Sequence, residues 1–355
     1  MKFSDKLIEW YLLKKRDLPW RRTKDAYKIW VSEIILQQTR VEQGLSYYER
    51  FIKKYPDVFD LASASESELL KMWQGLGYYS RVRNMYIAAK EIIEKYNGVI
   101  PDSFDEIMRL KGIGKYTASA ILSFAYDLPY PVMDGNVKRF LARYFCIEQD
   151  VKSLAAEKLI FQKLNKIFDK HRASDFNQAI MEFGALQCTI SNPDCQRCVF
   201  KKECKAYKNN KVSGLPLVSR KTQPKIRHFY YFVPVIEIKR KQLTYLVKRE
   251  DDDIWKHLFQ FPLIETEKAL PRKELLDSAD FKKLIDNKRY EVIGFSEKFA
   301  HKLSHQIINA VFIQLMIFAE LKDRKLKKVM IKDFKKYPVS RLTEKYLKKN
   351  LSNYI

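Results

Sequence analysis

Four of the chain's five cysteines lie within 17 residues, and this cluster limits the possible folds more than any other feature. Cys188, Cys195, Cys198 and Cys204 have the spacing Cys-x6-Cys-x2-Cys-x5-Cys, whereas Cys146 stands apart. Such short loops let four thiolates surround one compact centre, either an iron–sulfur cluster or a tetrahedral zinc ion. An odd total with tight clustering does not suit a secreted disulfide framework. The sequence predicts a metal site in a reducing compartment, and Cys146 is expected to be a small buried hydrophobe on a helix face.

The charge of the chain indicates a polyanionic partner. Lys and Arg number 67 and Asp and Glu 43 in 355 residues, which leaves a formal net charge of +24. Nucleic acid is the first candidate, an anionic membrane surface the second, and a merely solvated basic surface remains the alternative. No 18-residue apolar run is present, and the N-terminus lacks the apolar core of a signal peptide. These features predict a cytoplasmic protein that does not span a membrane.

Periodicity divides the chain into two domains. Residues 1–207 carry repeated helical patterns and are predicted to form a mainly α domain. Residues 208–225 contain glycine and two prolines among polar residues and are predicted to be a linker. Residues 226–355 begin with the strand-like runs His228–Ile238 and Leu243–Val247, so an α+β domain is expected there. A helical pattern is predicted for Arg272–Asn287, and a solvated terminal helix for the basic stretch Lys322–Lys349.

Two glycines form a candidate phosphate-binding turn within Leu110-Lys111-Gly112-Ile113-Gly114-Lys115-Tyr116-Thr117. Gly112 and Gly114 let the backbone approach a phosphate closely, and the helix predicted after them adds its positive N-terminal end. An ordinary turn between two helices would have a similar pattern.

Two carboxylates are candidates for catalysis. Glu33 lies in an otherwise apolar helical turn, where a dry pocket would favour its protonated form. Asp134 precedes the helical pattern of 136–145, where it is either only an N-cap or a carboxylate held ionised to face a developing cation. A pair of carboxylates in different environments is the arrangement that glycoside cleavage generally uses.

The strings WVSEIILQQT, GLGYYSR, LKGIGKYTASA and DGNVKRFLAR together resemble, in order and spacing, the MutY family of adenine DNA glycosylases. That family belongs to the endonuclease III, or helix-hairpin-helix, superfamily, and the resemblance covers nearly all of residues 1–207. It implies that Glu33 is the general acid and base, that Asp134 stabilises or bonds to the cationic sugar, and that Asn136 orients this site. Tyr116 occupies the position where glycosylases that also cut the backbone have a lysine. Base removal without efficient strand cleavage is therefore expected.

The resemblance assigns further roles. The cysteine loop after FNQAIMEFGALQC matches that superfamily's [4Fe–4S] loop, so the cluster is preferred over zinc. Gln38 and Tyr78 match residues that wedge into the DNA stack, and Trp20, Arg21 and Gln178 match the adenine pocket. The turn with Gly112, Gly114 and Lys115 matches the DNA-binding hairpin, where family members also bind a monovalent cation.

The C-terminal domain resembles the MutT-like recognition domain that adenine glycosylases carry, through DIWKHLFQFP and HKLSH. In the family the second string recognises the oxidised guanine, so Leu303, Ser304 and His305 are the expected recognition residues. Leu303 replaces the usual aromatic residue, which weakens the expected stacking. The glutamate-rich helix that nucleotide hydrolysis needs is absent from the sequence, so binding without hydrolysis is expected.

The resulting hypothesis is a monofunctional glycosylase that removes adenine opposite 8-oxoguanine or guanine. It would act as a monomer on double-stranded DNA that carries an adenine mispair, with other repair proteins as further partners. An endonuclease III-like glycosylase/lyase for oxidised pyrimidines is the alternative, and a catalytically silent DNA-binding module is the third hypothesis.

Overall fold

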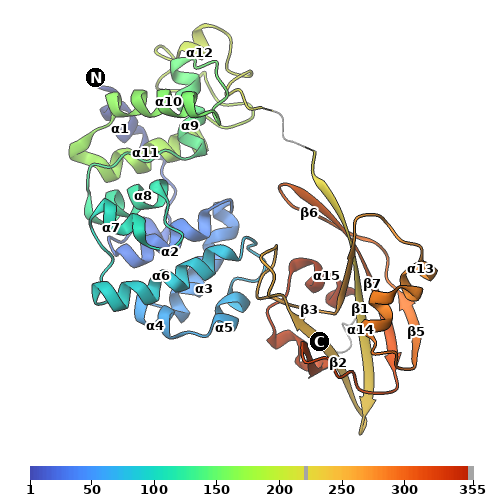
Figure 1. Ribbon diagram of the computed structural model, residues 1–355. Helices are drawn as coiled ribbons and strands as arrows, with labels where there is room; N and C mark the ends of the chain where they lie inside the picture. Colours follow the sequence, from blue (N-terminus) through green and yellow to red (C-terminus); the bar gives the residue numbers. More distant parts are fainter. Residues whose placement is uncertain (220–222, 351–355) are drawn as a thin grey trace. The chain divides into compact units, whose positions relative to one another are not determined.

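The computed structural model describes residues 1–219 and 223–350, and contacts divide these into two compact units. The first unit comprises residues 1–63 and 84–219, and the second comprises residues 64–83 and 223–350. The linker predicted at 208–225 therefore falls partly outside the described residues, at 220–222. Figure 1 shows helices throughout the first unit and a sheet in the second.

The first unit is helical, as the periodicity of residues 1–207 predicts. Its elements are α1 (Phe3–Lys14), η1 (Pro19–Arg21), α2 (Ala26–Leu36), α3 (Val41–Lys54), α4 (Val58–Ser63), α7 (Phe104–Arg109), α8 (Lys115–Tyr126), α9 (Gly135–Phe145), α10 (Leu154–Ile167), η2 (Lys170–Arg172), α11 (Ala173–Leu186) and α12 (Lys205–Lys208). Two further helices are α5 (Glu66–Met72), in the second unit, and α6 (Ser80–Tyr96), which begins in the second unit and continues in the first.

Side-chain caps and an aromatic core position these helices. Asp25 caps α2 by accepting hydrogen bonds from the backbone N–H of Tyr27 and Lys28, which satisfies donors that have no partner within the helix. Helices α1, α9, α10 and α11 bury one shared cluster, in which Phe140, Phe183 and Phe200 are almost fully inaccessible. Burial of these rings holds α9 and α11 together, and both helices contribute to the cavity described below.

The second unit contains one eight-stranded sheet. Its strands are β1 (Lys225–Ile238), β2 (Lys241–Lys248), β3 (Phe259–Gln260), β4 (Leu263–Thr266), β5 (Tyr290–Phe295), β6 (Phe299–Lys302), β7 (Gln306–Ile317) and β8 (Leu326–Met330). The main order is β3-β2-β1-β7-β5, with β1 and β7 parallel at the centre. Strand β6 pairs antiparallel with β7, so these two strands form a hairpin (Figure 1).

Helices cover both faces of this sheet. Phe229, Tyr231 and Phe312 lie in a core with residues of α15 (Arg341–Asn350). The residue after Tyr231, Phe232, packs against Phe281 of α14 (Ala279–Leu284), on the opposite face. Since side chains alternate along a strand, the continuous apolar run of β1 supplies both cores.

Two expectations about local structure were wrong, those for the basic stretch Lys322–Lys349 and for Cys146. The basic stretch Lys322–Lys349 contains β8, the 3-10 helix η3 (Ile331–Lys336) and α15, and the α15 residues Leu342 and Tyr346 are buried rather than solvated. The helical pattern predicted for Arg272–Asn287 is confirmed, and it forms two short helices, α13 (Arg272–Asp277) and α14. Cys146 is the left-handed C-cap of α9 and only partly buried, since the helix ends before it. Among the described residues, no helix is both long and apolar enough to cross a membrane.

Candidate active site

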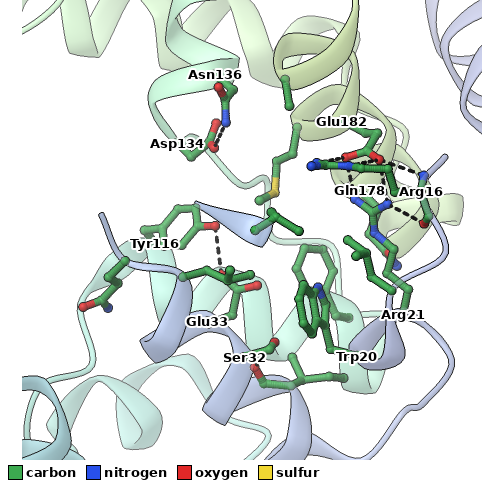
Figure 2. Close-up of a pocket in the computed structure, with 18 of the residues that line it drawn as sticks. Arg16, Trp20, Arg21, Ser32, Glu33, Tyr116, Asp134, Asn136, Gln178 and Glu182 are labelled. Carbon is green, nitrogen blue, oxygen red and sulfur yellow. Dashed lines mark hydrogen bonds and ion pairs between the residues drawn. The ribbon is translucent and has the colours of Figure 1, made fainter. Parts of the chain in front are cut away.

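A cavity of about 450 Å³ lies in the helical unit (Figure 2). Eight of the residues singled out from the sequence line it: Trp20, Arg21, Glu33, Gln38, Tyr116, Asp134, Asn136 and Gln178. They come from η1, α2 and its C-terminal end, α8, α9 with its N-cap, and α11. A volume of this size is in the range of ligand-binding pockets, and it brings together segments that are far apart in the sequence.

Glu33 is a buried carboxyl group in the last turns of α2, with 6% of its surface exposed. Burial disfavours its charged form and raises the pKa of Glu33 to about 7, although the hydrogen bond from Tyr116 acts in the opposite direction. The Tyr116 hydroxyl donates to Glu33 Oε2 at 2.9 Å, from the first turn of α8. A carboxyl with such a pKa can donate a proton near neutral pH and accept one afterwards.

Asp134 points into the cavity from a different element and is bonded differently (Figure 2). It is the N-cap of α9: Oδ1 accepts from the Val137 backbone N–H at 2.7 Å, and Oδ2 accepts from the Asn136 amide at 2.8 Å. Burial raises the pKa of Asp134 above its ordinary value, and these hydrogen bonds oppose that shift. Arg139 in turn donates to Asn136 Oδ1 at 2.9 Å and so orients the amide.

A buried ion pair that the sequence analysis missed forms another part of the cavity wall. Glu182, on α11, has a side chain that is 1% exposed. Arg16 and Arg21 each donate two side-chain hydrogen bonds to this carboxylate, at 2.6 to 2.9 Å. Burial alone would raise the pKa of Glu182, but these bonds outweigh burial and hold it at about 2. Glu182 follows Gln178 by four residues, so helical spacing could have placed both on one face.

The adenine-pocket candidates occupy the same wall. Trp20 is buried, and its ring contacts the Tyr48 ring edge to face, with centroids 5.1 Å apart. Gln178 accepts from the Tyr11 hydroxyl at 3.0 Å and donates to Ser174 at 3.2 Å. These contacts hold an aromatic surface and an amide at fixed places in the cavity.

The glycine turn joins α7 to α8 outside the cavity. Gly112 has φ +82°, and a Cβ there would lie 2.6 Å from the Cβ of Asn84, so both backbone conformation and space require glycine. Gly114 is the N-cap of α8, and a Cβ there would meet nothing within 4 Å. Lys115 is exposed in the first turn. The N-terminal amides of α8 therefore lie beside open space, as binding of an anion requires.

The four clustered cysteines line one small pocket in the helical unit. Within the described residues, no three His, Cys, Asp or Glu side chains converge as the ligands of a single metal ion would. The Arg143 guanidinium lies 3.5 Å from Cys188 Sγ, where it can offset thiolate charge. An all-sulfur donor set around one pocket fits an iron–sulfur cluster, which takes four cysteine thiolates as its ligands.

The remaining predicted residues lie in the second unit. Leu303, Ser304 and His305 form the tip of the β6–β7 hairpin, between Lys302 and Gln306. Ser304 and His305 are exposed, with Ser304 Oγ 3.0 Å from His305 Nδ1. The Tyr78 hydroxyl donates to Ser304 Oγ at 3.3 Å. Tyr78 therefore does not line the cavity but lies with the hairpin-tip residues.

Comparison with known proteins supports the same assignment of family. Residues 31–170 match the model of the HhH-GPD superfamily of base excision DNA repair proteins. The chain is 37% identical over 316 residues to an adenine DNA glycosylase of Buchnera aphidicola subsp. Baizongia pistaciae, covering 88% of this chain and 86% of that protein. It is 40% identical over 213 residues to the human adenine DNA glycosylase, covering 58% of this chain and 39% of that protein.

Solved structures resemble the helical part. A thermostable thymine-DNA glycosylase is 28% identical with a TM-score of 0.53, and the match covers 58% of this chain and 95% of that one. An endonuclease III trapped on DNA has a TM-score of 0.51 at 24% identity, with 58% and 94% coverage, and this likeness concerns the fold alone. The predicted helix-hairpin-helix domain followed by an α+β domain is thus confirmed.

Proposed function

Because this chain belongs to the adenine DNA glycosylase family and is a DNA glycosylase of base excision repair, we propose that it hydrolyses the N-glycosidic bond of adenine paired with 8-oxoguanine or guanine. The observation that carries this proposal is a single cavity lined by two carboxyl groups: Glu33, whose pKa is raised to about 7, and Asp134, which caps the N-terminus of α9. The protein acts on DNA, and the identity of the base pair that it recognises is what we propose here.

In the proposed mechanism, Glu33 protonates a ring nitrogen of the flipped adenine. Adenine is a poor leaving group until it is protonated, and a carboxyl with a pKa of about 7 holds the necessary proton at neutral pH. Tyr116 fixes one carboxyl oxygen through its 2.9 Å hydrogen bond. The resulting carboxylate then accepts a proton from the attacking water.

Asp134 stabilises the positive charge that develops on the sugar as the base leaves. Its two oxygens are held by Val137 N–H and by the Asn136 amide, so the carboxylate need not reorient during the reaction. Trp20, Arg21 and Gln178 hold the adenine against the opposite wall. Tyr116 is not an amine and cannot form a Schiff base with the sugar, which supports base removal without strand cleavage over the lyase alternative.

Recognition of the opposite base is assigned to the second unit. Ser304 and His305 are exposed polar groups at a hairpin tip, where they can hydrogen-bond a base. Tyr78 supplies an aromatic ring beside them, and Gln38, with Tyr78, is assigned to filling the gap that the flipped adenine leaves. Apart from Tyr78, which lies in the second unit, residues 1–207 are assigned to catalysis and residues 226–355 to recognition, in a protein that acts as a monomer.

The N-terminal amides of α8, with Gly112, Gly114 and Lys115, are assigned to a DNA phosphate, together with a monovalent cation at the turn. The [4Fe–4S] cluster is assigned to Cys188, Cys195, Cys198 and Cys204. When bound, the cluster supplies a rigid, redox-capable centre that orders its loop, and the proposed bond cleavage does not pass through it. Cysteines that are to ligate a cluster must not be oxidised to disulfides, which suits a reducing compartment such as the cytoplasm.

The test of this proposal uses duplexes with adenine opposite 8-oxoguanine, guanine or thymine, analysed with and without alkali. Adenine release from the first two, with strand breaks mainly after alkali, is expected. Breaks without alkali, or release of an oxidised pyrimidine from a parallel duplex, would favour the lyase alternative. Tight binding with no release would leave a DNA-binding module.

The metal assignment predicts about four irons and an equal amount of sulfide per chain in protein purified under reducing, anaerobic conditions. Replacing Cys198 with serine is expected to lower both contents, whereas Cys146→Ser is expected to leave them unchanged because Cys146 lies outside the pocket. Iron and sulfide analysis of the three proteins measures this. A single equivalent of zinc with no iron would show the assignment to be wrong.

A further inference from the structure

Arg227 is the centre of a polar network in the second unit. Its guanidinium, with a side chain 11% exposed, donates two hydrogen bonds of 2.6 Å to the Glu265 carboxylate. It also donates to both oxygens of Asp253, at 3.0 and 2.6 Å. Asp253 accepts a further bond of 2.8 Å from Arg249, whose own side chain is 7% exposed. The domain lacks the glutamates that nucleotide hydrolysis needs, so that activity does not explain why the Arg227 guanidinium is so fully paired.

The same guanidinium reaches the base of the hairpin that carries Ser304 and His305. Arg227 Nη1 donates to Gln306 Oε1 at 3.1 Å, and Gln306, 5% exposed, is the first residue of β7. The Gln306 carbonyl accepts from the Leu303 N–H at 2.8 Å and closes the turn. Through this one amide side chain, Arg227 constrains both ends of the hairpin tip.

Asp253 connects the network to a second support of the hairpin. It belongs to the loop between β2 and β3, in which Trp255 has φ +61°, a conformation that a bulky residue rarely adopts. The Trp255 ring lies edge-on to the His301 ring, with centroids 5.6 Å apart, and His301 is on β6. Arg227 therefore holds β7 directly through Gln306 and holds β6 through Asp253, Trp255 and His301.

From these contacts we infer that Arg227 is a positioning residue for recognition of the base opposite adenine, which acts by fixing the β6–β7 hairpin tip. This inference rests on the proposed function, in which that tip contacts the opposite base. A guanidinium suits the role because its five N–H donors bond both oxygens of two carboxylates and an amide at once, for which the three donors of a lysine ammonium do not suffice.

A purely structural role makes a different prediction. If Arg227 only stabilises the fold, its loss lowers the thermal midpoint and reduces adenine release opposite 8-oxoguanine and opposite guanine by the same factor. If Arg227 positions the hairpin tip, its loss lowers the preference for 8-oxoguanine, because contacts specific to the lesion need an exact position and the chemistry at Glu33 does not.

The experiment compares wild type, Arg227→Lys, Gln306→Leu and the exposed control Arg324→Met. For each full-length protein, kcat/KM for adenine release is measured opposite 8-oxoguanine and opposite guanine, together with the thermal midpoint. Gln306→Leu removes only the link to the hairpin and leaves both carboxylate pairs of Arg227 intact, so it remains informative if the arginine variant folds poorly.

The preference ratio is kcat/KM opposite 8-oxoguanine divided by kcat/KM opposite guanine. In both test variants this ratio is expected to fall about ten-fold, as removal of one hydrogen bond to a charged group would cause. Their rates opposite guanine should stay within about two-fold of wild type, and Arg324→Met should match wild type throughout. An unchanged ratio in both variants, despite a clear preference in wild type, would overturn the inference about Arg227 alone. If wild type itself shows no preference, the proposed recognition role of the hairpin fails and this inference fails with it.

Discussion

Replacing Glu33 with glutamine is expected to reduce the rate of adenine release about 10²- to 10⁴-fold, the range that general acid–base catalysis contributes. Glutamine preserves the shape of the side chain and can still accept the Tyr116 hydrogen bond, but it cannot transfer a proton to adenine. Single-turnover kinetics on a duplex with adenine opposite 8-oxoguanine measures the effect. Binding to the same duplex is expected to remain within a few-fold of wild type, since the variant removes no cationic group.

Two further measurements distinguish loss of the Glu33 proton donor from a loss of folded protein. The wild-type rate is expected to fall as pH rises through about 7, because ionisation of Glu33 removes the acid form. The raised pKa also means that the folded state binds this proton more tightly than the unfolded state, so stability is lost between pH 4.5 and 7, by about 3 kcal/mol in all. Glu33→Gln should therefore be at least as stable as wild type at pH 8. A variant that releases adenine at the wild-type rate would contradict the assigned chemistry.

Replacing Glu182 with glutamine is expected to destabilise the helical unit by about 3 kcal/mol, the lower end of the cost of breaking a buried ion pair. The change leaves Arg16 and Arg21 without their carboxylate, and Arg21 has a side chain only 15% exposed. The lower end applies because Arg16 remains 30% exposed and can recover some hydration. Urea unfolding at pH 7 measures the loss of free energy of unfolding.

The matched control is Glu157→Gln, which breaks the partly exposed pair with Lys138 and should cost at most about 1 kcal/mol. The pKa of Glu182, about 2 in the folded protein, gives a second check. Its stabilisation is fully present above its ordinary pKa of 4.5 and is lost as pH falls from there toward 2. The difference in stability between wild type and Glu182→Gln should shrink in that window. Equal cost for both variants at pH 7 would show that the buried pair contributes no more than a surface one.

Local patterns were sufficient to predict several elements, and their failures have physical causes. The helix at 115–126 follows from apolar spacing after a glycine turn, and the N-cap at Asp134 follows from its short side chain. The burial of part of the basic stretch Lys322–Lys349 could not be predicted from its composition, because charged residues dominate it. Its apolar residues, among them Tyr346, pack on the sheet. The Tyr346 ring stacks on the Phe312 ring of β7, with centroids 3.9 Å apart, and this long-range contact is visible only in the tertiary structure.

The sequence by itself determined which side chains are available for chemistry: the carboxyls of Glu33 and Asp134, a tyrosine rather than a lysine at 116, and the four clustered thiols. It did so because residue type and short spacing specify functional groups and local caps. Only the tertiary structure decided how those groups behave. Burial between α2 and α8 raises the pKa of Glu33, and a carboxylate from α11 pairs with two arginines from near the N-terminus. Such effects depend on distances between segments remote in the chain, and on the water excluded from between them, which no local pattern encodes.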